Sequence, residues 1–260
     1  VGGMGEVYRA TRVALGRTVA LKILAPELTA DRKYVESFLS EARAAGRLNH
    51  PNVIGVHEVG EENGVYYLSM EYVEGGSVQD LLAGGAKLDP LRATEIALQA
   101  ARALEYAEKA GIVHSDVKPD NLMLTTTGEV RLADLGIAKR LKAGGKAEQE
   151  EGVFGSPHYM APEQARGQPL DHRADLYSLG ATYYRMLSGR PPFVGKDARE
   201  VMEKQVFAAP EVMEMSKKET MMRKTNAAIE AFKSQRLRWV TGRSQIKVEI
   251  DEKRYQQAVD

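Results

Sequence analysis

Four polar residues that lie close together in the sequence carry most of its chemical information. Asp116, Lys118 and Asn121 belong to residues 114–121 (HSDVKPDN), and Asp134 begins residues 134–136 (DLG). The set offers a carboxylate that can take a proton, a cation, a carboxamide and a second carboxylate on a glycine turn. Phosphoryl transfer needs these groups, because a hydroxyl must be oriented, metal ions held and positive charge placed against the moving phosphoryl group.

A glycine-rich stretch and a strand lysine occur near the start of the chain. Residues 1–7 (VGGMGEV) contain three glycines that let backbone N–H groups approach a phosphate closely. Residues 19–22 (VALK) are an apolar, β-compatible run that ends in Lys22, and Glu41 lies in a helical stretch. The alternative interpretations are an ordinary hairpin turn for the glycines and a solvated strand lysine for Lys22.

The order of these motifs resembles that of Hanks-type (eukaryotic-like) serine/threonine protein kinases, and in particular their bacterial branch. After the four motifs above come residues 161–163 (APE) and residues 175–180 (DLYSLG), which resemble the start of the family's long buried helix. The match covers about residues 1–207. It is incomplete at the glycine loop, whose first glycine would precede Val1, so we expect upstream sequence to be missing. After about residue 207 the chain is divergent or truncated.

The resemblance implies an enzyme that uses ATP and Mg²⁺ to phosphorylate serine or threonine hydroxyls of protein substrates. It assigns Asp116 to the proton of the hydroxyl and Lys118 to the transferring phosphate; a lysine there also implies serine/threonine rather than tyrosine substrates. Asn121 and Asp134 are implied to bind Mg²⁺. The residues that it places around ATP are Val1, Gly2, Gly3, Gly5, Val7, Ala20, Lys22, Glu41, Met70, Glu71 and Val73.

Within this set the resemblance distinguishes several roles. Lys22 contacts the α- and β-phosphates, and Glu41 fixes its position. Met70 forms the back of the adenine pocket, for which core filling is the alternative role. Glu71 and Val73 offer backbone hydrogen bonds to adenine.

Ser115 departs from the family pattern. The commonest family residue at this position is arginine, whose charge is offset by a phosphorylated activation loop. Residues 137–155 contain no serine, threonine or tyrosine, so the basic receptor and its phosphorylation site are absent together. We therefore expect an enzyme that loop phosphorylation does not switch on. The competing hypothesis is a pseudokinase that binds nucleotide or acts as a scaffold; retention of every ligand residue favours catalysis. A small-molecule kinase is a weaker third possibility, because residues 155–163 resemble a peptide-seating loop.

Composition narrows the partners. Lysine plus arginine and aspartate plus glutamate balance at 36 each, which argues against a general nucleic-acid footprint. The absence of cysteine excludes disulfides, thiolate metal sites and cysteine nucleophiles. No apolar run is long enough to cross a bilayer and no signal peptide is visible, so we expect a cytoplasmic domain without membrane contact, in a chain whose remainder could carry an anchor. A homodimer is possible.

The predicted elements give an α+β fold of two lobes. A β-rich N-lobe spans residues 1–74, with strands over 18–24, 53–59 and 65–71 and a helix from Asp31 that His50 ends. A helical C-lobe spans residues 75–207, with a helix from Pro90 to about Ala110, short strands over 122–124 and 130–132, and more helices from residue 162. Residues 208–260 do not match the family and are predicted to form a helix over 211–235 and then a possible hairpin over 238–250.

Overall fold

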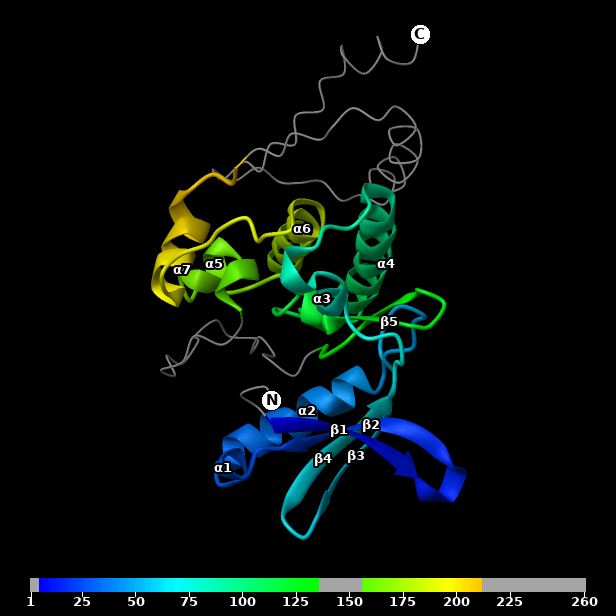
Figure 1. The fold of residues 1–260 in the computed structure, drawn as a ribbon. Helices are drawn as coiled ribbons and strands as arrows, with labels where there is room; N and C mark the ends of the chain where they lie inside the picture. Colours follow the sequence, from blue (N-terminus) through cyan, green and yellow to red (C-terminus); the bar gives the residue numbers. More distant parts are fainter. Residues whose placement is uncertain (1–4, 136–155, 212–260) are drawn as a thin grey trace.

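The computed structural model describes residues 5–135 and 156–211, without the side chains of Lys33, Ser37 and Glu41. In these ranges the chain forms a small lobe built on an antiparallel sheet and a larger helical lobe, joined at the end of β4 (Figure 1). This is the predicted bilobal α+β architecture. The predicted helix over 211–235 and hairpin over 238–250 lie outside the described residues, apart from residue 211.

The small lobe is a four-stranded sheet covered by one long helix. Its strand order is β1-β2-β4-β3. Helix α2 packs on the sheet through Val35, Phe38 and Ala42, which recur at helical spacing and meet Leu24 and Leu68 in one buried cluster. The elements of this lobe are β1 (Gly5–Arg12), β2 (Arg17–Leu24), α1 (Pro26–Thr29), α2 (Arg32–Ala45), β3 (Val56–Glu62) and β4 (Val65–Glu71).

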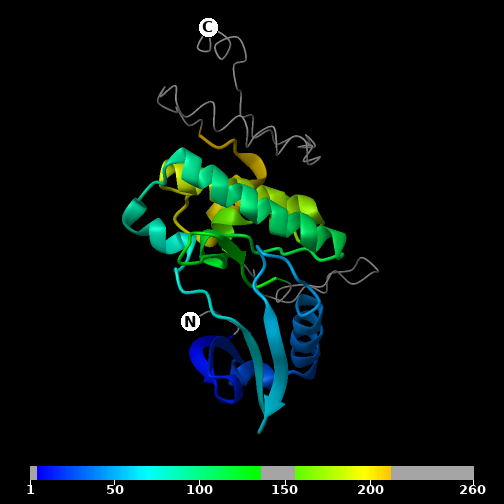
Figure 2. The same ribbon diagram turned by 90° about the vertical axis from the view of Figure 1, so that its right-hand side faces the viewer.

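The large lobe is built around two long helices that lie side by side (Figure 2). Helix α4 begins as predicted, with Pro90 in its first turn and the Asp89 side chain accepting hydrogen bonds from the N–H groups of Leu91 and Arg92. The Thr94 hydroxyl of α4 and the Tyr183 hydroxyl of α6 are 2.9 Å apart. The elements of this lobe are α3 (Val78–Leu81), α4 (Pro90–Lys109), β5 (Leu122–Leu124), β6 (Val130–Leu132), α5 (Pro162–Ala165), α6 (His172–Ser188) and α7 (Ala198–Phe207).

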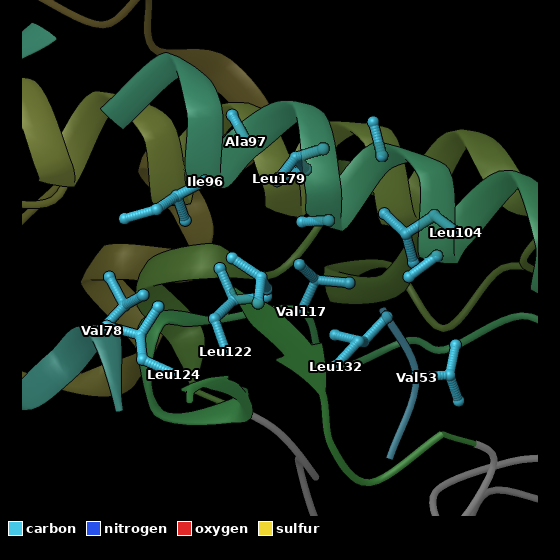
Figure 3. Packing of buried hydrophobic residues seen from close by; sticks show 14 of the residues in the cluster. Val53, Val78, Ile96, Ala97, Leu104, Val117, Leu122, Leu124, Leu132 and Leu179 are labelled. Atoms are coloured by element: carbon cyan, nitrogen blue, oxygen red, sulfur yellow. The ribbon is translucent and has the colours of Figure 1, made fainter. Parts of the chain in front are cut away.

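The core of the large lobe lies directly under the segment that carries the candidate catalytic residues. Ile96 and Leu104 of α4 point toward Val117 and Leu122 (Figure 3). Val117 and Leu122 are fully buried. Pro119 is buried as well, so the apolar side chains of this segment fix the backbone that carries Asp116 and Lys118. In the part of the chain that the structure describes, no helix is long and apolar enough to cross a membrane.

The connection between α2 and β3 corrects two sequence predictions. The helix ends at Ala45 rather than near His50, and the next strand begins at Val56 rather than at Val53. Leu48 and Val53 are buried in the cluster of the large lobe, and Val53 forms an isolated bridge to Leu132. Their apolar side chains fit a helix and a strand of the small lobe in sequence, but their packing partners belong to the other lobe.

Hydrogen bonds fasten this connection to the large lobe. The Asn52 carboxamide donates to the Val130 carbonyl at 2.9 Å and to the Gln99 side chain at 3.1 Å. The Leu132 N–H donates to the Asn52 carbonyl at 2.8 Å. Because the connection belongs to the small lobe by sequence and to the large lobe by contact, it sets the position of one lobe relative to the other.

Candidate active site

The carboxylate of Asp116, the predicted catalytic group, is held by two polar side chains from the same loop. The Asp116 Oδ2 atom accepts hydrogen bonds from Lys118 Nζ at 2.8 Å and from Asn121 Nδ2 at 3.2 Å. Asn121 Nδ2 also donates to the Asp116 carbonyl at 2.8 Å. The other carboxylate oxygen, Oδ1, has no partner among the described residues. The three predicted catalytic residues are thus brought together, with one acceptor oxygen available to a hydroxyl.

Buried hydrogen bonds fix the backbone on which Asp116 lies. Asp175 in the first turn of α6 accepts the N–H of His114 at 2.8 Å and the N–H of Ser115 at 2.7 Å. Burial raises the pKa of Asp175, while the two N–H donors act in the opposite direction. Loss of this carboxylate would leave two buried N–H groups without an acceptor, so Asp175 supports the whole loop.

His114 joins the predicted catalytic loop, residues 114–121, to the segment before Asp134. Its ring is fully buried, its Nε2 donates to the Ala133 carbonyl at 2.8 Å and its Nδ1 accepts the Asp116 N–H at 3.2 Å. A carbonyl only accepts and an N–H only donates, so both contacts require the neutral tautomer with its proton on Nε2. His114 therefore has the structural role that a lone buried histidine predicts.

Lys22 of β2 reaches the second carboxylate across the two lobes. Its Nζ lies 3.0 Å from Asp134 Oδ1, and the residue is 7% exposed. Asp134 has φ 56° and Ser115 has φ 61°, a backbone region that costs energy for residues other than glycine. Ser115 directly precedes Asp116, and Asp134 is itself the second carboxylate, so both strained residues lie at the candidate site. The backbone of the predicted partner Glu41 lies in α2, and its side chain lies outside the described residues.

One face of the small sheet carries the residues expected around the nucleotide. Val7 on β1 is the cross-strand partner of Lys22, and Ala20 is the partner of Met70 on β4. Cross-strand partners share a face, and residues two apart on β2 do so as well, so all four side chains lie on one face. Gly5 begins β1, whereas Val1, Gly2 and Gly3 lie outside the described residues.

The end of β4 offers backbone groups next to this face. Met70 is buried, and the N–H of Glu71 donates to the Gly55 carbonyl at 2.8 Å. The Glu71 side chain turns toward the joint between the lobes, where Oε1 lies 3.3 Å from Arg131 Nε. The N–H of Val73 has no partner among the described residues, so it is available to a ligand.

The oxygen donors of the site suit a hard divalent cation. Asn121 uses its amide nitrogen for Asp116, which leaves its Oδ1 atom, and Asp134 uses Oδ1 for Lys22, which leaves its Oδ2 atom. The Ala133 N–H donates to the Asn121 carbonyl at 2.8 Å, so Asn121 lies next to the segment that carries Asp134. Mg²⁺ is commonly held by one or two protein oxygens together with phosphates and water. Among the described residues no group of three acidic, histidine or cysteine side chains could hold a metal alone.

The segment beyond residue 155 borders the catalytic aspartate on its other side. A narrow crevice, without space for a water molecule, is lined by Asp116, Ser115, Ser156, Tyr159 and residues of α5 and α6. Gln164 of α5 donates from Nε2 to the Ser115 carbonyl at 3.0 Å. Burial raises the pKa of Tyr159 to about 12, so this phenol stays neutral. The segment predicted to seat a peptide thus contacts the loop that carries Asp116 directly.

A two-lobed fold with a lysine from the sheet and a fixed aspartate, asparagine and second aspartate from the helical lobe defines a phosphotransferase fold of the protein kinase type. A sequence model of the protein kinase domain matches residues 1–243, beyond residue 207 where we expected the resemblance to end. The chain therefore belongs to the protein kinase family, in its bacterial Hanks-type serine/threonine branch.

Several curated proteins are similar to this chain. A probable serine/threonine-protein kinase of Streptomyces coelicolor is 42% identical over 215 residues, which cover 81% of this chain and 32% of that protein. Serine/threonine-protein kinase PknB of Mycobacterium leprae is 38% identical over 213 residues, covering 80% and 34%. PknA of Mycobacterium tuberculosis is 41% identical over 214 residues, covering 80% and 49%. The chain spans between a third and a half of the length of these relatives.

Sequence reasoning missed three polar residues that support the site. Asp175 was predicted only as part of a buried helix, and Gln164 and Gln205 were not considered. Asp175 and Gln205 are 3% and 2% exposed. The signal that could have found such residues is a polar side chain at a helix position where the apolar spacing predicts burial. Gln205 is an example, because it lies four residues after the buried Val201.

Proposed function

We infer that this domain transfers the γ-phosphoryl group of ATP to serine or threonine hydroxyls of protein substrates. The observation that carries the inference is the Asp116 carboxylate, held by Lys118 and Asn121 with one oxygen left for a hydroxyl, opposite the Lys22–Asp134 pair. Positioning and electrostatic stabilisation supply most of the catalysis in phosphoryl transfer, and this arrangement supplies both.

The proposed reaction uses the free oxygen of Asp116. The substrate O–H bond breaks as the new O–P bond forms, and the proton passes to Asp116 Oδ1. The bond between the γ-phosphorus and the bridging oxygen breaks, and ADP leaves. Lys118 lies 2.8 Å from the other carboxylate oxygen and is placed to balance charge on the transferring group.

The remaining residues hold the nucleotide. Mg²⁺, held by Asn121 and Asp134, neutralises phosphate charge when bound. Lys22 contacts the α- and β-phosphates, and Glu41 is assigned to orient it. The backbone of Glu71 and Val73 binds the adenine edge against Met70. Residues at the sheet face and the glycine loop cover the nucleotide; they are Val1, Gly2, Gly3, Gly5, Val7 and Ala20.

We further propose that catalysis does not require a phosphorylated activation loop. Ser115 is 5% exposed and its backbone is held by Asp175 and Gln164. A serine hydroxyl cannot form the charged, two-point contact that arginine makes with a phosphate. Phosphatase treatment should leave the initial rate unchanged, and a large loss of rate traced to Ser156 or Tyr159 would contradict this proposal.

The pseudokinase hypothesis is the alternative, since a domain with this fold can bind nucleotide and signal by docking alone. The two differ in turnover rather than in ATP binding. We place the reaction in the cytoplasm because ATP is there, and we expect protein substrates rather than nucleic acid. A homodimer stays a prediction.

The test is phosphoryl transfer from labelled ATP with Mg²⁺ to a generic basic protein. Asp116→Asn should lower turnover by about two to four orders of magnitude, the range for losing a positioned acid/base group, with ATP binding little changed. Asp120→Asn is the matched control, because this exposed acid lies on the same turn and should stay within about threefold of the parent. Equal activity of Asp116→Asn and parent would contradict the assignment. ATP binding without any transfer by the parent would favour the pseudokinase.

A further inference from the structure

Helix α7 buries one polar side chain, Gln205. The helix buries only Gln205 and Val201, and Gln205 is 2% exposed. Burying a carboxamide without hydrogen bonds strongly lowers the stability of a protein. The hydrogen-bond partners of Gln205 therefore indicate what its burial achieves.

Gln205 connects three separate segments. Its Nε2 donates to the Pro157 carbonyl at 2.8 Å, and its Oε1 accepts the Tyr177 hydroxyl of α6 at 2.5 Å. The Pro157 carbonyl can only accept, so the amide nitrogen must face it and the amide oxygen must face the phenol. Burial raises the pKa of Tyr177, which keeps the phenol protonated as a donor. The orientation of the amide is therefore determined by its neighbours.

The segment that receives this hydrogen bond borders the catalytic aspartate. Pro157 begins the turn Pro157–Tyr159, in which the Tyr159 N–H donates to the Ser156 carbonyl at 3.0 Å. Ser156 and Tyr159 line the crevice next to Asp116. Gln164 ties the segment that follows this turn to the catalytic loop. Gln205 holds the turn itself through the Pro157 carbonyl, so α7 and the catalytic loop are both tied to this segment.

We propose that Gln205 is a positioning residue for the protein substrate. Its amide fixes the position of residues 156–159 relative to Asp116, and the phosphoacceptor region of the substrate binds against these residues. The proposal rests on the proposed kinase function for the identity of the ligand. It assigns α7 a part in substrate binding although α7 contributes no residue to the crevice beside Asp116.

A purely structural role for Gln205 makes a different prediction, and a double-mutant design separates the two. Gln205→Met keeps the volume but removes the donor to Pro157 and the acceptor for Tyr177. Tyr177→Phe removes only the second hydrogen bond. The double variant has no Tyr177 hydroxyl, so no buried hydroxyl is left without an acceptor and much of the stability lost in Gln205→Met should return. The hydrogen bond to the Pro157 carbonyl is still missing.

The measurements are KM for a generic basic protein, KM for ATP, melting temperature and amide exchange. We expect KM for the protein substrate to rise about tenfold in both Gln205→Met and the double variant, the factor for one lost hydrogen bond, with KM for ATP changed less than twofold. Tyr177→Phe should stay within about threefold of the parent. A double variant that recovers its melting temperature and its protein KM together would overturn the proposal.

Amide exchange of Tyr159 tests the same proposal without activity. The exchange rate should rise several-fold in Gln205→Met and in the double variant, while amides in the middle of α6 are unchanged. If the parent transfers no phosphate, the proposed function fails and this measurement alone decides the role of Gln205. Unchanged exchange at Tyr159 in the double variant would overturn it.

Discussion

The first strand and the catalytic loop serve one site but differ in how the protein holds them. Among the described residues, strand β1 is an edge strand that pairs only with β2, and its Val7 and Tyr8 are 59% and 47% exposed. In the catalytic loop, His114 and Ser115 are 0% and 5% exposed. Segments with few buried contacts open at low free-energy cost, whereas segments tied into the core open only with the domain.

This difference separates two requirements of catalysis. The groups that meet developing charge must be fixed before the substrate arrives, because reorganising them during the reaction costs energy. A cover over the nucleotide must instead let ATP enter and ADP leave. The catalytic loop meets the first requirement through Asp175 and His114. The exposed edge strand suits the second if it covers the nucleotide as proposed, since it has little packing to lose on moving.

Removing the support of the catalytic loop should have the largest effect. Asp175→Ala leaves the N–H groups of His114 and Ser115 without acceptors, at about 1–3 kcal/mol each. We therefore expect the variant to lose about 2–6 kcal/mol of stability and to lose activity as well. Asp171→Ala is the matched control on the same helix. Its side chain is half exposed and caps the first turn of α6, so its loss should cost about 1 kcal/mol. Equal melting temperatures for the two variants would show that the loop is not held from beneath.

Weakening the metal site should affect binding more than stability. Asp134 is part-exposed in its pair with Lys22, so Asp134→Asn should change the free energy of unfolding by less than about 1 kcal/mol. Binding of Mg-ATP should weaken by about tenfold or more, because the proposed role of this carboxylate is to hold Mg²⁺ against the phosphates. Adenosine is the matched control ligand and should bind almost unchanged. Calorimetry with both ligands measures this, and equal losses would place Asp134 outside the metal shell.

Two glycines of the first hairpin test whether β1 acts as a cover. A methyl group on Gly5 would lie 2.0 Å from the Ile23 carbonyl oxygen, so Gly5→Ala must displace the start of β1. Gly16, also at positive φ, has open space around it. Gly16→Ala should lower stability by about 1 kcal/mol and leave ATP binding unchanged. We expect Gly5→Ala to weaken Mg-ATP binding several-fold and to lower stability by about 1–2 kcal/mol, more than Gly16→Ala because of the backbone clash. A loss of stability as large as that of Asp175→Ala would remove the contrast between the two regions.

The sequence predicted what local pattern determines. Strand β4 and the short strands β5 and β6 have their predicted bounds, and α4 begins at its predicted cap. The four groups around Asp116 could be found because a few consecutive residues contain most of them. Contacts across the lobes could not be found. Leu48 and Val53 fit a local helix and strand, and only the packed structure shows that Val53 pairs with Leu132, almost 80 positions later. For the same reason Gln205 gave no signal that it reaches Pro157.

The connection between α2 and β3, which local pattern failed to predict, should also make stability depend on pH. This is the smallest effect that we expect. Burial, and then the charges of Arg102 and Arg131, lower the pKa of His50, whose Nδ1 accepts the Asn52 N–H at 3.1 Å and whose ring stacks on Tyr106. Protonation forfeits that hydrogen bond. The folded state therefore binds this proton less readily than the unfolded state, and the stability that neutral His50 contributes above pH 6.5 is lost as the pH falls below it.

His50→Phe keeps an aromatic ring against Tyr106 but cannot titrate. Its melting temperature should be lower than that of the parent near pH 7.5, because the Asn52 N–H has lost its acceptor. Between pH 7.5 and pH 5 the melting temperature of the variant should fall less than that of the parent. The difference should be about 2 °C at most, since the histidine is partly exposed and water screens its charge. Melting curves at several pH values give the slope of melting temperature against pH for both proteins. Parallel slopes would mean that protons bind His50 equally in both states, and that acid acts on this joint through other groups.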